Sequence, residues 1–378
     1  MASAAATSMK KNHYIQNLRG YAAILLVIDH ALLSLANFGV LPKRIEYLAD
    51  DLGAMGVHIF FVISGFIMMY IAFDSFGKPF APRQFIAARI KRVVPLYYFA
   101  TALALGINAL AGNSPYRWTD ILLSMCFLPS HAHPGSAEFL YPVLGVGWTL
   151  NYEMFFYLLF TCALLFKRRL GVPFITCSLL ILIAAGSGLR LTSQHPIDAS
   201  LLFEIVRYFT RDIMLYFVFG IAIGLVARSS RCPSLSIPMP ALIGCGLGVA
   251  EVCLCNYLIA HQQPLWRTAL TMLIAILAVG FCVVARQTGQ SWLAEKLGDA
   301  SYSIYLFHRF FVAAAVSIWL HWIGRFYWGE VCAGVLLGIG GGYLAYALVE
   351  RRLTNLVHRK PSVRSARPEE AVASVEPA

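Results

Sequence analysis

An arginine and a histidine stand eleven positions apart in the apolar segment RGYAAILLVIDH. At about 100° per residue, these eleven steps end about 20° past three whole turns, so Arg19 and His30 would share one helix face. The rise between them is about 16 Å, roughly half of the hydrocarbon core of a membrane. This spacing predicts a proton-exchanging imidazole at mid-membrane depth and a guanidinium at the inner edge. The plainer interpretation is a structural histidine, with an arginine that extends to the headgroups.

A second set of polar side chains lies in two other apolar segments. In GWTLNYEMFFYLLF, Trp148 and Tyr152 are four residues apart, and Glu153 lies about 8 Å along the helix from Trp148. In DASYSIYLFHRFF, His308 lies about 12 Å from the expected inner end. We therefore expect His30, Glu153 and His308 at similar depth. The alternative for Glu153 is a structural pair with an arginine or histidine of another helix.

Two arginines precede the third apolar segment, in RQFIAARIKRVVP. Arg89 and Arg92 are three residues apart and so adjacent on one helical face, and we expect Pro95 to start the next span. Basic residues at an inner membrane edge commonly determine topology or contact lipid headgroups. The sharper hypothesis is a phosphate clamp for a cofactor that arrives from the cytoplasm, because guanidinium groups suit phosphate geometry.

Other polar or flexible positions are expected to be structural. Asp29 points about 100° away from His30 and could pair with another helix. His58 lies nearer the outer face, where a water-facing or structural histidine is the default. The glycine run at 338–342 lies inside an apolar span, so it predicts close helix packing and not a phosphate loop. Ser64 is interpreted as part of a mid-membrane helix and not as a nucleophile.

The composition explains why these groups must be considered in lipid. Hydrophobic residues make up 59% of the chain and charged residues only 13%, against about 25% in soluble domains. This excludes a soluble enzyme, a disordered protein and a disulfide-stapled secreted domain. The apolar runs are long and continuous, which excludes a transmembrane β-barrel. The nine cysteines include no CxxC pair and are interpreted as small buried apolar residues, and we expect no metal site.

Apolar runs between charge clusters predict an all-α, polytopic integral membrane protein. At about 20 residues per span, 378 residues allow about ten transmembrane helices. The segment 120–129 is too short to span and is expected to be an outer-face or re-entrant piece. The expected spans are 19–37, 53–73, 93–112, 146–166, 172–192, 205–227, 238–260, 268–286, 300–320 and 329–349.

The distribution of Lys and Arg predicts the orientation. With the N-terminus inside, 21 of the 30 Lys and Arg fall on inner segments, which predicts that both termini are cytoplasmic. This bias also accounts for the net charge of +11, so no nucleic-acid partner is expected. We divide the chain into a polar N-terminal segment (1–12), a transmembrane domain (13–352) and a disordered cytoplasmic tail (353–378). No internal repeat is visible, so an inverted-repeat transporter gains no support.

Taken together, the motifs resemble those of the membrane-bound acyltransferase-3 family over about residues 13–352. Their order and spacing, more than any one piece, carry the resemblance. Within the family the chain is similar to exopolysaccharide O-acyltransferases of the succinoglycan type and to transacylases of bacterial cellulose synthesis. Two departures are His58, where relatives often carry Asp, and the lack of the SGNH-type extracytoplasmic domain that some members append. The matching pieces are Arg19-x10-His30, GVHIFFVISGFIM (56–68), RIKRVVPLYY (89–98), GWTLNYEMFFY (147–157), SYSIYLFH (301–308) and LVERR (348–352).

The resemblance implies acyl transfer, usually of acetyl, from cytoplasmic acyl-CoA to a hydroxyl of a cell-surface or exported polysaccharide. His30 would be the general base with Arg19 as its motif partner, while Arg89 and Arg92 would bind the CoA phosphates. Glu153 would hold or tune the site, and Trp148, Tyr152, His58 and His308 would support the substrate. The resemblance further implies a multi-pass protein of the bacterial inner membrane, with no permanently bound cofactor. Polysaccharide synthase or export machinery and membrane lipid are the expected partners.

Elementary chemistry is consistent with this. A sugar hydroxyl attacks a thioester poorly unless a base removes its proton, and a neutral histidine typically contributes about 10²–10⁴-fold. Direct transfer and a covalent acyl-histidine both remain open. So do two other classes of protein: a transporter or flippase for lipid-linked sugars, and a non-catalytic assembly subunit of a polysaccharide synthase.

Overall fold

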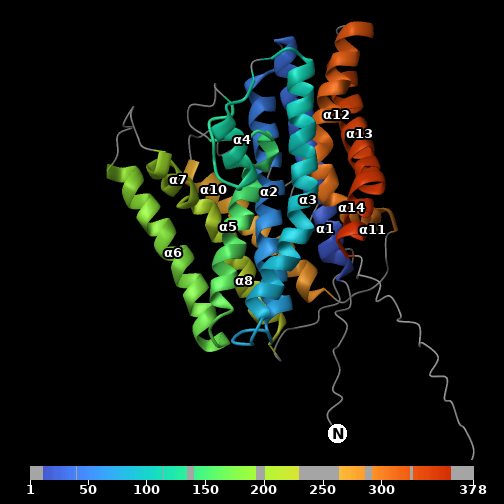
Figure 1. The fold of residues 1–378 in the computed structure, drawn as a ribbon. Helices are drawn as coiled ribbons and strands as arrows, with labels where there is room; N and C mark the ends of the chain where they lie inside the picture. Colours follow the sequence, from blue (N-terminus) through green and yellow to red (C-terminus); the bar gives the residue numbers. More distant parts are fainter. Residues whose placement is uncertain are drawn as a thin grey trace, which may run out of the picture.

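The protein is a bundle of helices (Figure 1). The computed structural model describes residues 12–39, 41–113, 115–133, 140–192, 201–229, 264–285, 292–323 and 327–358. Within these ranges every regular element is helical, as the apolar runs predict. The elements are α1 (His13–Leu33), η1 (Ser34–Phe38), α2 (Lys43–Ala72), α3 (Ala81–Leu110), α4 (Trp118–Met125), η2 (Gly145–Gly147), α5 (Trp148–Ala163), α6 (Arg168–Thr192), α7 (Leu201–Phe209), η3 (Asp212–Met214), α8 (Leu215–Ala227), α10 (Pro264–Val284), α11 (Trp292–Asp299), α12 (Ser301–Trp322), α13 (Tyr327–Ala345), the π-helical η4 (Tyr346–Glu350) and α14 (Arg351–His358).

The expected count of ten spans is not confirmed. Six helices in the described ranges are long and apolar enough to cross a membrane, or seven if the pair α7–α8, bent by 41°, is one span. The sequence predicts a full span over 146–166, but α5 has only 16 residues, since it starts after the 3-10 turn η2 and already ends at Ala163. The apolar part of α10, Ala269–Val284, is also short. The expected span 238–260 lies outside the described residues.

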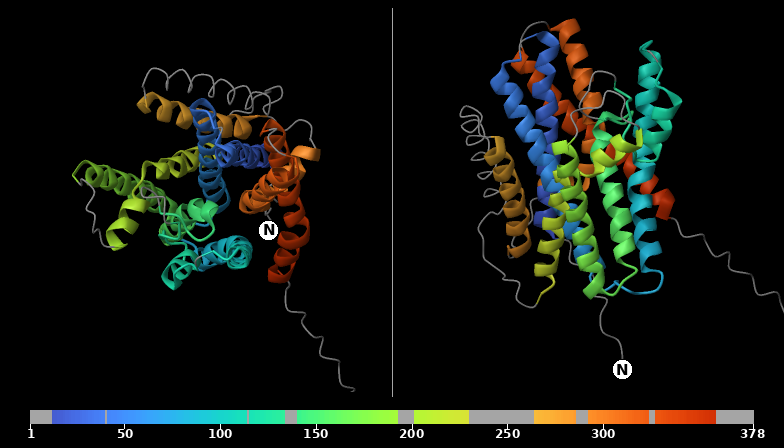
Figure 2. Two further views of the ribbon diagram at one scale, coloured as in Figure 1. Left: turned by 90° about the horizontal axis from the view of Figure 1, so that it is seen from above. Right: turned by 90° about the vertical axis from the view of Figure 1, so that its left-hand side faces the viewer.

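Helix α2 occupies the middle of the bundle and packs against α1, α8 and α10 (Figure 2). Its approach to α8 is close because glycines face each other. A Cβ atom at Gly65 would meet the Phe217 carbonyl oxygen and lie 3.1 Å from the Gly220 Cα atom. Small residues of this kind let two helix backbones touch where lipid supplies no hydrophobic driving force. The glycine run at 338–342 acts in the same way, since a Cβ atom at Gly342 would lie 2.6 Å from the Ile304 Cα atom of α12.

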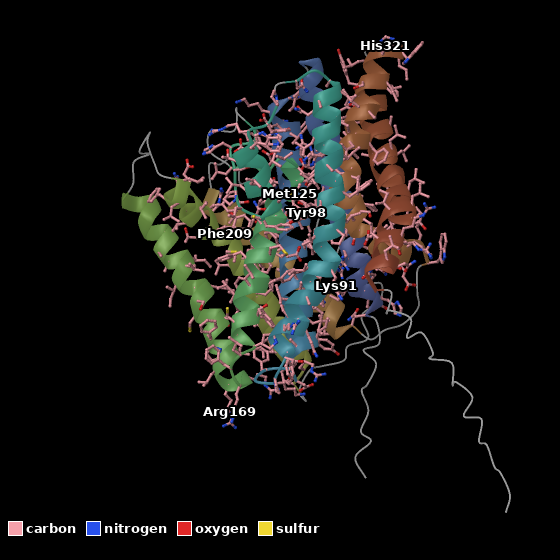
Figure 3. The ribbon with its side chains drawn as sticks, in the orientation of Figure 1. Lys91, Tyr98, Met125, Arg169, Phe209 and His321 are labelled. Carbon is pink, nitrogen blue, oxygen red and sulfur yellow. The ribbon has the colours of Figure 1, made fainter. Side chains whose placement is uncertain are left out.

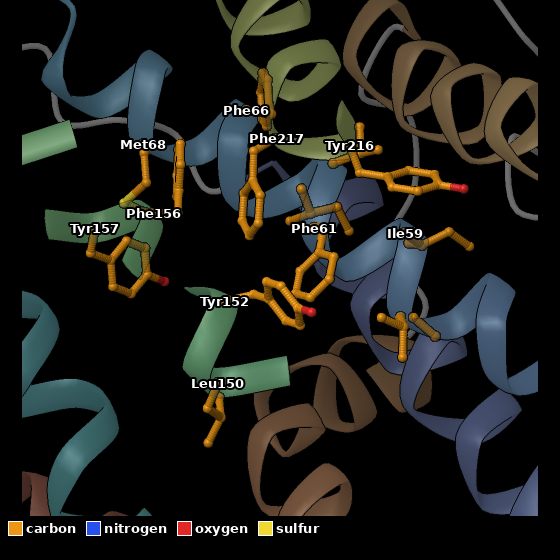
Figure 4. Packing of buried hydrophobic residues seen from close by; sticks show 14 of the residues in the cluster. Ile59, Phe61, Phe66, Met68, Leu150, Tyr152, Phe156, Tyr157, Tyr216 and Phe217 are labelled. Carbon is orange, nitrogen blue, oxygen red and sulfur yellow. The ribbon is translucent and has the colours of Figure 1, made fainter. Parts of the chain in front are cut away.

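Aromatic side chains fill the space between α2, α5 and α8 (Figure 4). Phe156 of α5 stacks on Phe217 of α8 with ring centroids 4.3 Å apart, and Phe61 of α2 lies 4.7 Å from the same ring. Tyr152 stacks on Tyr208 at 4.5 Å. Ring contacts of this kind contribute beyond their buried area, so they fix the short α5 against the central helix.

Helix α3 starts earlier than the sequence suggests. Pro95 was expected to begin a span, but it lies inside one continuous helix that also carries Arg89 and Arg92. A proline ring removes one backbone donor and disturbs the preceding turn, and neighbouring helices can satisfy the freed groups in a membrane. The carbonyl oxygen that loses its helical donor to Pro95 is that of Lys91, and two residues further on the Tyr302 hydroxyl of α12 donates to the Val93 carbonyl oxygen at 2.9 Å, which ties α12 to this turn.

The last transmembrane helix also differs from expectation. A π-helical turn over Tyr346–Glu350 leads into α14, which continues to His358. The boundary predicted at residue 352 therefore falls inside a helix. Leu353 packs against the core, and this contact stabilises the helical turn directly after the predicted boundary. The tail from residue 359 lies outside the described residues.

Three turns that the sequence assigns to the inner side meet at one end of the bundle. The Arg168 guanidinium lies 3.9 Å from the centre of the Phe73 ring, and that of Arg228 lies 4.9 Å from it. Arg228 also pairs with Asp74. The ends of α2, α5 and α8 are thus together, with Arg169 at that end and His321 at the opposite one (Figure 3). The expected topology places these three helix ends on the same side of the membrane, and the structure agrees. The side on which each terminus lies stays a prediction.

Candidate active site

Two cavities lie between the helices and share Val57 of α2 and Tyr305 of α12 as a common wall. The inner cavity measures about 90 Å³ and the outer about 540 Å³. Polar side chains divide sharply between them. The inner cavity is lined by Arg19, Ser64, Arg89, Arg92, Glu153 and Tyr157. The outer cavity is lined by Asp29, His30, Asp50, His58, His133, Trp148, His308 and Arg309.

The structure brings His30 and His308 together in the outer cavity. Their rings meet edge to face with centroids 4.9 Å apart. Nδ1 of His30 lies 3.0 Å from the Leu26 carbonyl oxygen, and Nδ1 of His308 lies 2.8 Å from that of Tyr305. A carbonyl oxygen can only accept, so both neutral rings carry their proton on Nδ1 and have a lone pair on Nε2. The fully buried Nε2 of His308 has no hydrogen-bond partner among the described residues.

Asp29 is closer to His30 than the helical wheel suggests. Its Oδ2 atom lies 3.1 Å from Nδ1 of His30, within ion-pair distance, and the aspartate is 6% exposed. Adjacent residues of a helix point about 100° apart, yet these two side chains meet at their ends. The carboxylate packs against Gly53 of α2. Asp29 therefore faces its own helix's histidine and not a basic group of another helix.

Three arginines gather at the inner cavity. Arg19 comes from α1, with Nη1 3.4 Å from Oε1 of Gln16, and Arg89 and Arg92 come from successive turns of α3. The Arg89 guanidinium lies 5.8 Å from the centre of the Phe85 ring. One carboxylate, Glu153, lines this cavity with them. The excess of guanidinium groups suits a ligand with several negative charges, such as a phosphate, to which arginine donates paired hydrogen bonds.

Glu153 does not lie beside the two histidines, although the sequence places it at their depth. Its Oε1 atom accepts a hydrogen bond from the Ser64 hydroxyl at 2.9 Å and another from the Tyr157 hydroxyl. The reason is the start of α5. Trp148 lies at the outer cavity, and five residues of helix carry Glu153 about 8 Å further toward the inner end. Glu153 therefore acts on the inner cavity.

Of the remaining predicted residues, two line the outer cavity and one lies in the core. Trp148 lines the outer cavity, as does His58, whose ring stacks on Tyr216 at 4.0 Å. Tyr152 lines neither cavity. It is fully buried in the aromatic core, and its hydroxyl donates to the Tyr208 carbonyl oxygen at 2.8 Å. Tyr152 was expected to contact substrate. It packs in the core instead, because the ring of Tyr208 stacks on its own ring.

The wall between the cavities is held by hydrogen bonds of Tyr305. Its hydroxyl lies 2.5 Å from Oγ1 of Thr149 and donates to the Val146 carbonyl oxygen, which fixes α12 against the start of α5. A group that enters from one cavity and a group that enters from the other would meet at this wall. In the ranges that the structure describes, no three His, Cys, Asp or Glu side chains form a metal-binding group.

Several residues of the site escape sequence reasoning. Ser64, treated as an ordinary helical residue, is the hydrogen-bond partner of Glu153. Tyr157 follows Glu153 by four residues, and this i, i+4 spacing is the signal that could have found it. Tyr305 precedes His308 by three residues within SYSIYLFH. Arg309 directly follows His308, and only the cavity shows that it faces the same space.

Comparisons with known proteins show the family to which the chain belongs. Residues 12–347 match the acyltransferase domain of the acyltransferase-3 family. The chain is 36% identical over 307 residues to the exopolysaccharide production protein ExoZ of Rhizobium meliloti, covering 80% of this chain and 90% of that protein. It is 26% identical over 345 residues to the acyltransferase MdmB of Streptomyces mycarofaciens, with 83% and 84% covered. No solved structure matches the chain. The chain therefore belongs to the acyltransferase-3 family.

Proposed function

We propose that the protein moves an acyl group, acetyl in the simplest case, from cytoplasmic acyl-CoA to a hydroxyl of an exopolysaccharide or its lipid-linked precursor. The observation that carries the proposal is the pair of cavities. An arginine-rich inner cavity and a histidine-containing outer cavity share the wall of Val57 and Tyr305. Donor and acceptor can therefore approach from opposite sides and react where the cavities adjoin.

The inner cavity is the donor side in this proposal. Arg19, Arg89 and Arg92 would bind the CoA phosphates, because each guanidinium can donate two parallel hydrogen bonds to phosphate oxygens. Glu153, held by Ser64, would limit the positive charge and orient the neighbouring guanidinium groups. The thioester would then lie next to the wall, with its acyl group toward the histidines.

The outer cavity is the acceptor side. The lone pair of Nε2 on His30 would take the proton of the acceptor hydroxyl as its oxygen bonds to the thioester carbonyl carbon. The carbon–sulfur bond would then break, and the departing CoA thiolate would take the proton from the imidazolium. Transfer by way of an acyl group on His30 would use the same Nε2 atom. Mass analysis of the protein after incubation with acyl-CoA alone separates the two routes.

The names of the relatives support the choice of reaction and acceptor. ExoZ is named as an exopolysaccharide production protein, and MdmB as an acyltransferase. Polysaccharide precursors are handled at the bacterial inner membrane, where acyl-CoA is available on the cytoplasmic side only. We therefore place the protein in that membrane, beside the synthase or export machinery that supplies the glycan.

The decisive experiment compares surface polysaccharide from cells with and without the protein by mass spectrometry. The expected result is an added acyl mass that disappears with the protein. Purified protein should also release free CoA from acetyl-CoA when the deacylated glycan is added. A polysaccharide of unchanged mass, reduced only in amount, would overturn the proposal in favour of a transporter or an assembly subunit.

A further inference from the structure

A carboxylate is held against the ring nitrogen of His30 that faces away from the proposed reaction. Oδ2 of Asp29 lies 3.1 Å from Nδ1 of His30, and Asp29 is 6% exposed. Its second oxygen, Oδ1, is buried and has no hydrogen-bond partner among the described residues. The carboxylate of Asp29 therefore contacts the imidazole, and it forms no ion pair with a lysine or arginine of the described helices.

The backbone of α2 is shaped to admit the carboxylate. A Cβ atom at Gly53 would meet Oδ2 of Asp29 and lie 2.7 Å from its Cγ atom. Any residue other than glycine at this position would push the carboxylate away from Nδ1. Alanine is otherwise favoured in a helix by about 1 kcal/mol over glycine, so the glycine is not there for the sake of helix stability.

The position of the charge matters because of the proton that His30 receives. The Leu26 carbonyl oxygen already accepts from Nδ1 and fixes the tautomer. When Nε2 takes the hydroxyl proton, the ring becomes a cation with the buried carboxylate of Asp29 at contact distance, where an opposite charge counts for more than it does in bulk water. A buried aspartate behind a catalytic histidine serves this purpose in hydrolases of unrelated fold.

We propose that Asp29 is a positioning residue that stabilises the imidazolium of His30 during acyl transfer, and that Gly53 provides the space for it. The inference rests on the proposed function, because it assumes that His30 is the base. The proton moves from the acceptor hydroxyl to Nε2 and then to the departing CoA thiolate. The negative charge of the Asp29 carboxylate offsets the positive charge of the ring between these two transfers.

The first test replaces the charge and keeps the shape, with Asp29→Asn. Because Leu26 still holds the tautomer, the loss should be smaller than the roughly 10⁴-fold effect seen where the aspartate alone fixes it. We expect kcat to fall on the order of 10²-fold, with KM for acyl-CoA and for the glycan unchanged. A variant that only disturbed packing would change both KM values or the thermal stability in detergent.

The second test leaves Asp29 in place and uses a double-mutant cycle. Gly53→Ala should lower kcat to a similar degree, and the same change in an Asp29→Ala background should cost nothing more, because the atoms it would displace are gone. Gly340→Ala in α13 is the matched control, since a Cβ atom there meets nothing within 4 Å, and it should keep full activity.

The outcomes separate this inference from the proposed function. If the unmodified protein transfers no acyl group, the proposed function fails. If it does transfer, and Asp29→Asn keeps near-normal kcat, the role of Asp29 is excluded. Should Asp29→Asn not fold, the stable Gly53→Ala variant decides alone, with normal turnover counting against the inference. An equal loss from Gly53→Ala in both backgrounds would show that the glycine does not act through the carboxylate.

Discussion

At the scale of single residues, the site depends on which nitrogen of each histidine is free. Both Nδ1 atoms face main-chain carbonyl oxygens within their own helices, so both Nε2 atoms are lone-pair bases. His30 differs from His308 in having a carboxylate beside it. This difference supports the proposal that His30 is the base and that His308 supports the acceptor.

His30→Ala should lower acyl transfer on the order of 10²-fold or more, because a positioned base is lost while the helix keeps its apolar length. Release of CoA from acetyl-CoA in the presence of glycan, measured on purified protein, gives the rate. His58→Ala is the comparison, since this ring stacks on Tyr216 in the same cavity and should cost less. Near-normal turnover by the His30→Ala protein would remove the proposed mechanism.

A second prediction at this scale concerns the arginines of α3. Changing both Arg89 and Arg92 to Gln should weaken acyl-CoA binding in calorimetry by at least tenfold, about 1.4 kcal/mol, because two charge-assisted phosphate contacts are lost. Lysine at both positions should restore only part of the affinity, since it cannot form paired hydrogen bonds. Lys91→Gln is the control on the same helix and does not line the cavity. Unchanged binding by the double Gln variant would return both arginines to a role in topology.

At the scale of helices, the site depends on close contacts that set where each helix lies. Gly65 and Gly220 let α2 and α8 touch, and Tyr302 supports α3 around Pro95. Tyr305 ties α12 to α5 through Thr149. The contacts of Tyr302 and Tyr305 lie at the cavities, so a small shift of one helix would change how the two cavities adjoin.

Gly220→Ala should destabilise the protein by about 1–3 kcal/mol, because its Cβ atom would lie 2.7 Å from the Phe66 nitrogen and 2.8 Å from the Gly65 Cα atom, which are main-chain positions that cannot rotate away. Thermal unfolding in detergent measures the loss. Gly280→Ala in α10 has open space around its Cβ atom and should be neutral or slightly stabilising. Equal effects of the two substitutions would contradict the packing argument.

At the scale of the whole molecule, the proposed function would give the two substrates separate entrances. The arginines and the turns that carry Asp74, Arg168 and Arg228 belong to the half of the bundle that the sequence assigns to the cytoplasmic side, and the histidine pair belongs to the other half. If CoA binds on one side and glycan on the other, as we propose, only an acyl group needs to move between them.

The expected topology is testable directly. Reporter fusions or cysteine labels after Lys78, Lys167 and Arg352 should all report the cytoplasm, because 21 of the 30 Lys and Arg fall on the segments assigned to that side. The first two positions follow α2 and α5, whose ends meet in the structure. A periplasmic signal from any one of the three would require a different orientation of the arginine cavity.

The sequence by itself determines several of the helices and the relation between polar groups on the same helix. Hydrophobic runs mark α1, α2, α6, α12 and α13, and the eleven-residue spacing places Arg19 and His30 on one side of α1, where they line adjoining cavities. The glycine run at 338–342 predicts close packing, and the approach of Gly342 to Ile304 confirms it. Periodicity suffices for these because the face of a residue and its spacing along the axis are properties of a single helix.

Tertiary structure alone decides which polar groups meet. Glu153 joins the arginines and not the histidines, Tyr152 turns into the core, and Asp29 reaches back to His30 because Gly53 leaves room. Each of these depends on the tilt, rotation and offset of a neighbouring helix, and no pattern within one segment specifies them. Pro95 shows the same limit, since the helix continues through it with Tyr302 of a distant segment bonded to the preceding turn.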